Sequence, residues 1–273
     1  MNWQQRLWRA VTTFLYASAP WLLYAVVPSF TMMAGMVIRR IVVIDDYIEQ
    51  SGNFYLFIGS LIVFWILRRR SRKRNSTWMK ETTLSLESPD IRYGIRCTLF
   101  GASFAVCISA LLTLIPFPEW LMSGYQENSA RIFVRTDFIL SLLVIGITSP
   151  LLEEMVFRGY MINRLMTYFT DRQAVWISAA VFGLVHVQPV WVIYATFFGY
   201  ILGAVSVKKD NILYAVCLHM GFNFPSLVNA VILRAGMGES FFFQSPVLIA
   251  MYGVIAGGAA WLLYRQYKTE EMI

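Results

Sequence analysis

Two adjacent glutamates within an apolar segment are the first residues of this chain whose types and spacing could do chemistry. Glu153 and Glu154 stand in the segment PLLEEMVFR, which ends at Arg158. In a helix, Glu154 and Arg158 lie four residues apart on one face and can form an ion pair, whereas Glu153 points about 100° away. Glu153 is thereby left without a partner in the motif, and a buried carboxylate of this kind is suited to act as a general base or acid.

The only two histidines of the chain, His186 and His219, also lie in apolar segments. Asn223 follows His219 by four residues, so the two side chains share a helical face and can act on one object. Gly183 and Gly221 are small neighbours that would let helices approach closely or leave room for a substrate backbone. We therefore expect the histidines, the amide and the glutamates to form one functional site.

Each of these features has a simpler explanation. The two carboxylates could cap the cytoplasmic end of a span in the headgroup region, and a lone buried histidine is more often a satisfied core residue than a catalyst. A charged side chain within a span costs roughly 2.5–3.5 kcal/mol, however, so such residues are usually paired or functional. The chain also has no histidine outside these segments. Together these facts favour the functional interpretation.

The composition indicates where such a site would be placed. Of the 273 residues, 58% are hydrophobic and 14% are charged, against roughly 45–50% and ~25% in a soluble domain. This excludes intrinsic disorder. No basic stretch is interleaved with polar loop sequence, which argues against nucleic-acid binding. We expect an all-α, polytopic transmembrane bundle surrounded by membrane lipids.

Hydropathy over a window of about 19 residues predicts about eight spans. The second and fifth are shorter than the ~20 residues that a full crossing requires. The eight stretches are Ala10–Ile38, Phe54–Leu67, Cys97–Ile115, Val134–Met155, Ala174–Val187, Val190–Val207, Ile212–Leu233 and Ser245–Tyr264.

The distribution of charge predicts the orientation, because Lys and Arg near span ends accumulate on the cytoplasmic side. With both termini inside, 18 of the 23 Lys and Arg residues fall on the inner face. The run RRRSRKR, from Arg68 to Arg74, is interpreted as an anchor to anionic headgroups. We thus predict a multi-pass protein of the plasma (inner) membrane, with a catalytic cavity that faces the cytoplasm.

The chain divides into two predicted parts. Residues 1–96 hold two spans and a basic cytoplasmic loop, and residues 97–273 hold six spans, with the motifs in 136–233. The three cysteines fall in apolar blocks without paired spacing, so disulfides and a zinc-cysteine cluster are not expected.

Three motifs in order, Glu-Glu-x-x-x-Arg, Phe-x-x-x-His and His-x-x-x-Asn, resemble those of the CPBP intramembrane protease family, which includes CAAX proteases and bacteriocin-processing (Abi) enzymes. The resemblance runs from about Thr136 to Leu233. It implies an endopeptidase with an eight-span helical fold and a site inside the membrane. Glu154 and Arg158 would be a structural pair, and we interpret Phe182, the motif aromatic, as a packing residue.

The resemblance also implies catalytic roles for four residues. Glu153 would be the glutamate that activates water, and His186 would help to hold that water. His219 and Asn223 would stabilise the oxyanion of the tetrahedral intermediate. This agrees with the helical geometry, which singles out Glu153 as the carboxylate without a partner in its motif.

A metal is the open question about cofactors. Glu153, His186 and His219 form a ligand set that could bind catalytic zinc, with water in the fourth position, as in a metalloendopeptidase. Glu154 would then have to serve as the base while paired with Arg158. The His-Glu-x-x-His signature of many zinc proteases is absent. We therefore favour a glutamate-activated water without an obligatory metal, and leave zinc open.

The predicted function is hydrolysis of a bond in a peptide or membrane-protein substrate. CAAX-like processing, peptide or bacteriocin processing and bacteriocin immunity are the candidate tasks. The alternative is a non-catalytic membrane scaffold or regulator of the same fold. A proton-coupled transporter is disfavoured, because neither repeated halves nor paired broken helices are evident. The oligomeric state is not predicted.

Overall fold

The computed structural model describes most of the chain, and every regular element among the described residues is a helix, as expected. Described are residues 2–41, 52–86, 89–129 and 138–234, and toward the C-terminus Ala250, Met251, 253–255, 257–258 and Trp261.

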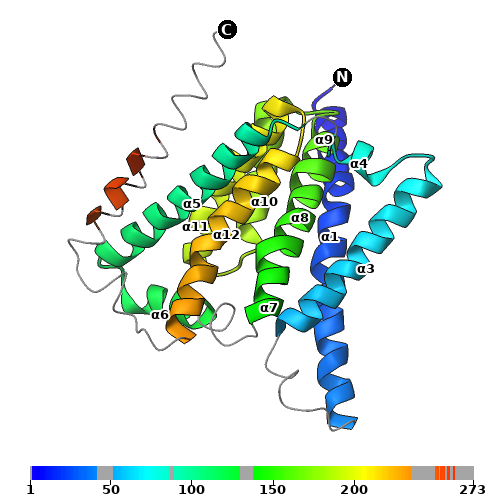
Figure 1. Ribbon diagram of the computed structural model, residues 1–273. Coiled ribbons are helices and arrows are strands. Elements are labelled where there is room, and N and C mark those ends of the chain that lie inside the picture. The colour runs from blue at the N-terminus through cyan, green and yellow to red at the C-terminus, as the bar shows by residue number, and fades with distance from the viewer. Residues whose placement is uncertain are drawn as a thin grey trace.

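Figure 1 shows the helices of the bundle. They are α1 (Trp3–Ile41), α3 (Gly52–Lys73), α4 (Trp78–Glu81), α5 (Ile91–Leu114), α6 (Glu119–Ser129), α7 (Phe138–Ser141), the π-helix η2 (Leu142–Thr148), α8 (Ser149–Glu154), the π-helix η3 (Met155–Ile162), α9 (Asn163–Leu165), α10 (Asp171–Leu184), α11 (Pro189–Lys209) and α12 (Leu213–Arg234).

Five of the described helical stretches are long and apolar enough to cross a membrane, so the chain is a multi-pass membrane protein. They are Trp3–Gly35, Ile91–Leu114, Phe138–Leu165, Pro189–Lys209 and Leu213–Ile232. Helix α3 has 22 residues but ends in a basic run, and α10 has only 14 residues. These are the two predicted spans that were short in the sequence. The eighth predicted span, Ser245–Tyr264, lies mostly outside the described residues.

The fourth predicted span is longer than its hydropathy indicates. It was expected to end at Met155, but the helical path from Phe138 continues to Leu165. The chain then turns into α10, whose first turn is held by a reciprocal capping box between Thr170 and Gln173. Glu153 therefore lies roughly 18 Å, at 1.5 Å per residue, from the end of the span. It is inside the bundle and not at the inner end of the span.

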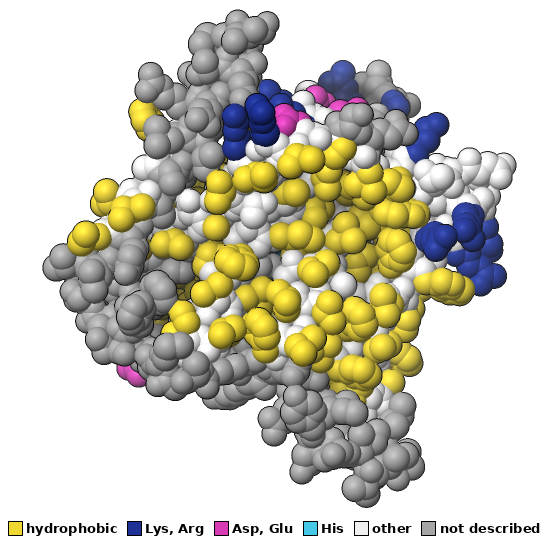
Figure 2. Space-filling view, viewed as in Figure 1, with side chains coloured by type: hydrophobic (Ala, Val, Ile, Leu, Met, Phe, Trp, Pro, Cys, Tyr) yellow, Lys and Arg dark blue, Asp and Glu magenta, His cyan; other side chains and the backbone are white. Residues whose placement is uncertain are grey.

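One end of the bundle gathers most of the described Lys and Arg side chains, which form the dark blue groups along the upper and right-hand margin of Figure 2. Here the start of α1 meets the segment after α9, where the Tyr168 hydroxyl donates to the carbonyl oxygen of Arg6 at 3.0 Å. The segment before α5 meets the start of α12, where the Asn211 amide donates to the carbonyl oxygen of Ser85 at 3.0 Å. We call this the basic end.

Helix α6 lies at the other end, which we call the α6 end. There the Gln188 side chain, just before α11, donates to the carbonyl oxygen of Leu121 in α6 at 3.2 Å. The start of α3 meets α7 through a hydrogen bond of 3.3 Å from the Asn53 amide to the Ser141 hydroxyl. Between the two ends, Figure 2 shows a broad apolar surface of the kind that suits contact with lipid.

Two glycines beside the histidines allow close contact between helices. A Cβ atom on Gly183 would overlap the Thr196 hydroxyl of α11, and one on Gly221 would overlap the carbonyl oxygen of Thr98 in α5. Of the two explanations that the sequence offered, the structure thus supports close helix approach. This packing brings α10 against α11 and α12 against α5 around the predicted site.

Candidate active site

Two π-helical segments flank the short α8 that carries the glutamates. Such segments are rare and often occur at functional sites. In η2 the N–H of Ser149 bonds to the carbonyl oxygen of Val144, five residues back. The next donor in that register would be Pro150, which has no N–H. The carbonyl oxygen of Ile145 instead accepts a hydrogen bond of 2.8 Å from the Asn223 amide of α12.

The second π-helix is tied to α10 in a similar way. In η3, the carbonyl oxygen of Phe157 accepts a hydrogen bond of 3.1 Å from the Ser178 hydroxyl. The Phe157 ring also packs edge-on against the ring of Phe182, with the centroids 5.2 Å apart. Side chains from α10 and α12 therefore hold the widened helix on both sides of the glutamates.

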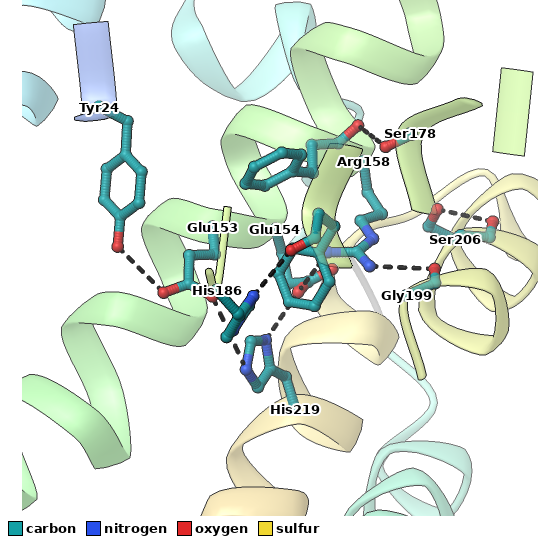
Figure 3. A network of polar contacts seen from close by, with 12 residues as sticks. Tyr24, Glu153, Glu154, Arg158, Ser178, His186, Gly199, Ser206 and His219 are labelled. Carbon is teal, nitrogen blue, oxygen red and sulfur yellow. Dashed lines mark hydrogen bonds and ion pairs between the residues drawn. The ribbon is translucent and has the colours of Figure 1, made fainter. Parts of the chain in front are cut away.

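Glu154 lies at the centre of a buried polar network (Figure 3). Its Oε1 atom accepts hydrogen bonds from Arg158 Nη1 at 3.0 Å and from His219 Nδ1 at 2.7 Å. Arg158 Nη2 donates to the carbonyl oxygen of Gly199 in α11 at 3.0 Å. Glu154 is 0% exposed and Arg158 1%. The predicted ion pair is confirmed, and full burial of Glu154 excludes the simpler explanation of a cap in the headgroup region.

The contact with His219 shows that Glu154 has more than one partner. A carboxylate can only accept, so Nδ1 of His219 carries the hydrogen in this bond. The other ring nitrogen, Nε2, lies 3.9 Å from Oε2 of Glu153. Glu154 thus orients the imidazole so that its free nitrogen faces Glu153. The sequence predicted a pair of Glu154 with Arg158, and the structure shows a triad with His219.

Glu153 has a partner that the motifs did not indicate. Its Oε1 atom accepts a hydrogen bond of 3.0 Å from the Tyr24 hydroxyl of α1, 129 residues earlier in the chain. The Glu153 side chain is 17% exposed, whereas Glu154 has no exposed surface. Figure 3 shows Glu153 between Tyr24 and His219. The two adjacent carboxylates therefore have different surroundings, as the helical geometry predicted.

The Phe182 ring packs against both histidine rings. Its ring centroid is 4.9 Å from that of His186 and 5.9 Å from that of His219. The guanidinium carbon of Arg158 is 4.3 Å from the same ring centroid, a geometry favourable for a cation–π contact. Nδ1 of His186 donates to the carbonyl oxygen of Phe182 at 2.7 Å, because a carbonyl can only accept. The Phe182 ring thus contacts both histidines and Arg158, as expected of a packing residue.

A cavity of about 1230 Å³ includes the residues predicted to be catalytic. Glu153, His186, His219 and Asn223 all line it, and so does Tyr24. One N–H of the Asn223 amide donates to the carbonyl oxygen of Ile145. Because an amide nitrogen carries two hydrogens, the second N–H can donate to another acceptor. The structure therefore brings all four predicted residues to one water-accessible space.

The cavity lining runs from Glu153 toward the α6 end and not toward the basic end. On the basic side, the bundle is filled by apolar side chains that are at most 1% exposed: Met155, Phe157, Met161, Ile162 and Leu165. They follow the glutamates directly in the chain, so the packing of η3 and α9 closes this side.

Among the described residues, the possible zinc ligands do not meet as a group of three. Two imidazoles and a carboxylate are donors that zinc accepts, and Glu153, His186 and His219 are the candidates. Among the residues that the structure describes, however, no three His, Cys, Asp or Glu side chains lie close enough together to hold a metal ion. We therefore derive no catalytic step through a metal.

Comparison with known proteins identifies the family of this region. Residues 135–225 match the family model described as Rce1-like, type II CAAX prenyl endopeptidase Rce1-like. Comparisons with curated proteins and with solved structures gave no match. The matched segment contains the two glutamates, both histidines and Asn223, whereas Tyr24 and the cavity walls in α5 and α6 lie outside it. Residues 135–225 are therefore similar to the Rce1-like family, in agreement with the resemblance of the three motifs to the CAAX proteases.

Proposed function

We propose that this protein is an intramembrane endopeptidase in which Glu153 activates the attacking water. The observation that carries the proposal is the difference between the adjacent carboxylates. Glu154 is fully buried and bonded to Arg158 and His219. Glu153 lines the cavity, and its contacts among the described residues are with the Tyr24 hydroxyl and the His219 ring. A general base needs access to water and to the substrate, which Glu153 has and Glu154 lacks.

In this mechanism a water molecule lies between Glu153 and His186. Glu153 takes a proton as the water oxygen bonds to the substrate carbonyl carbon. His186 has its Nδ1 hydrogen committed to the carbonyl oxygen of Phe182. Its Nε2 lone pair can therefore accept a hydrogen bond from the water. The tetrahedral intermediate collapses when the C–N bond breaks, and the proton on Glu153 passes to the leaving amine.

The oxyanion would be stabilised from α12. The second N–H of Asn223 is one donor, and Nε2 of a doubly protonated His219 is the other. The carboxylate of Glu154, 2.7 Å from Nδ1, holds that ring in its orientation. Arg158 and the carbonyl oxygen of Gly199 hold Glu154 in place. Donors that are positioned before the reaction are effective because they need no reorganisation as charge develops.

The proposal is tested by comparing membrane peptides from cells that express three forms of the protein. Glu153→Gln should abolish the processing of peptides that the wild type cleaves. Glu81→Gln is the matched control, because it makes the same change in a carboxylate at the basic end, outside the cavity lining. Glu153→Gln protein that still processes these peptides would overturn the proposal. If it produces no processing but rescues a deletion phenotype, the non-catalytic scaffold or regulator is favoured instead.

A further inference from the structure

We propose that substrates reach Glu153 from the non-cytoplasmic side of the membrane. The substrates are then peptides, or segments of membrane proteins, that are exposed on that side. The proposal rests on the proposed function for the cleavage itself. The side of access follows from two independent observations, the path of the cavity and the distribution of charge.

The path of the cavity is marked by polar side chains on three helices. It continues from Glu153 past Asn223 to Ser226 and Asn229, along α12 toward its C-terminal end. Ser109 and Thr113, in the last turns of the neighbouring helix α5, line the same cavity. Polar groups at membrane depth are tolerated where they line a water-filled space. The cavity therefore offers a hydrated route between the site and the α6 end.

Helix α6 lies beside the end of this route. Ser123 and Gln126 of α6 line the cavity, together with Glu119. Trp120 on the same helix is 76% exposed. Exposed tryptophan is typical of the membrane–water interface, which places α6 at the boundary of the bilayer. The polar route from Glu153 thus ends at an aqueous surface.

The opposite route is blocked. Apolar core residues of η3 and α9 fill the space between Glu154 and the basic end. Beyond them, Tyr160 contacts the Ser71 hydroxyl of α3 at 3.3 Å. A Cβ atom on Gly159 would already overlap Thr82, so this region has no room for a peptide. A substrate that arrived at the basic end would have to displace the buried apolar side chains of η3 and α9.

The distribution of charge identifies the two sides. At the basic end the described helices and loops carry fifteen Lys and Arg residues: Arg6, Arg9, Arg68, Arg69, Arg70, Arg72, Lys73, Arg74, Lys80, Arg92, Arg96, Arg164, Arg172, Lys208 and Lys209. At the α6 end, the described backbone carries Arg39, Arg40 and Arg234. Lys and Arg at span ends accumulate in the cytoplasm, so the basic end is cytoplasmic and the α6 end faces away from it.

The two observations select the substrate class. A peptide in the cytoplasm would have to cross the membrane before it met Glu153, whereas a translocated peptide could enter directly. The cytoplasmic C-terminus of a prenylated protein is therefore disfavoured as the substrate. A secreted peptide, or a membrane protein cleaved near its outer interface, fits the geometry.

Cysteine accessibility tests the side of access without any need for cleavage. Ser123→Cys places a thiol on α6, Asn229→Cys places one inside the cavity, and Thr167→Cys places one at the exposed loop of the basic end. Each variant is treated with a charged, membrane-impermeant maleimide in spheroplasts and in inside-out vesicles from the same bacterial cells. The wild-type chain, with its three cysteines, is the blank, and Gln126→Cys replaces Ser123→Cys if that protein does not fold.

We expect Ser123→Cys and Asn229→Cys to be labelled in spheroplasts and Thr167→Cys to be labelled in inside-out vesicles. The reverse pattern would overturn the proposal. So would labelling of Asn229→Cys from the same side as Thr167→Cys, or from neither side. Repeating the experiment with Glu153→Gln separates this proposal from the proposed function, because the labelling must persist when cleavage is lost.

Discussion

The helices of the family-matched segment and helix α1 use their side chains in different ways. In an 18-residue apolar stretch of each of the spans Phe138–Leu165 and Leu213–Ile232, 39% of the residues are buried inside the bundle, against 17% in such a stretch of the α1 span. The matched helices direct polar groups inward, where these groups bond to one another. Most of α1 is exposed, yet it contributes the Tyr24 hydroxyl to Glu153. The helices of the matched segment thus supply most of the site, and the peripheral helix α1 adds one hydrogen bond to Glu153.

The strongest test of the core is removal of its buried cation. Arg158→Ala leaves Glu154 fully buried without its ion-pair partner, which should cost about 3–5 kcal/mol and greatly reduce the yield of folded protein. Thermal unfolding of the purified protein in detergent measures the loss.

The double variant Glu154→Leu/Arg158→Met is the control for this prediction. It removes both charges together, so much of the stability should return while cleavage stays absent. A single Arg158→Ala variant as stable as the wild type would contradict the assignment of this pair to the core.

A smaller but still large effect is expected on α12. Asn223→Ala removes one proposed oxyanion donor, and loss of such a donor typically lowers kcat about 10²–10³-fold. The carbonyl oxygen of Ile145 also loses its side-chain donor, so a lower unfolding temperature should accompany the loss. An unchanged kcat with a lower unfolding temperature would show that Asn223 only stabilises the fold, through its hydrogen bond to Ile145 in η2.

The contribution of α1 is expected to be smaller again. Tyr24→Phe removes the hydroxyl that bonds to Glu153 and retains the ring. A hydrogen bond to a charged group is worth roughly 1.5 kcal/mol or more, so kcat should fall about tenfold or more, with KM little changed. Tyr16→Phe is the matched control on the same helix, because Tyr16 contacts Arg164 through its ring and its carbonyl oxygen, which are both retained. Equal activity of the two variants would show that α1 does not contribute to catalysis.

The smallest effect is expected from metal removal. The described residues do not form a metal site, and the proposed mechanism uses none. Treatment of the purified protein with a chelator should therefore leave the rate of cleavage unchanged. Loss of activity that added zinc restores, together with stoichiometric zinc in the untreated sample, would contradict this prediction.

The polar core could be predicted because polar groups are scarce in the spans. Glu154 and Arg158 share a helical face, so their pairing follows from local geometry alone. The position of Glu153 on another face is equally local. The scarcity of histidine, with both copies in apolar segments, pointed to the same region of the chain. The structure brings these residues around one cavity.

The rest depends on long-range packing. No motif marks Tyr24, which meets Glu153 across 129 residues. Pro150 is visible in the sequence, but the use of Asn223 as a donor to Ile145 depends on where α12 lies. The polar glutamate motif lowers hydropathy, which made the span seem to end at Met155. The path of the cavity could not be predicted, because it depends on which half of the bundle the apolar residues fill.

The rate of cleavage by the Glu153→Gln variant tests the central claim most directly. Purified wild type, Glu153→Gln and Glu81→Gln would be placed in lipid nanodiscs with a peptide identified from the membrane-peptide comparison. New peptide termini would be followed over time by mass spectrometry. We predict cleavage by the wild type and by Glu81→Gln, and none by a Glu153→Gln protein that unfolds at the wild-type temperature. Cleavage by folded Glu153→Gln at the wild-type rate would contradict the role of Glu153 as the base.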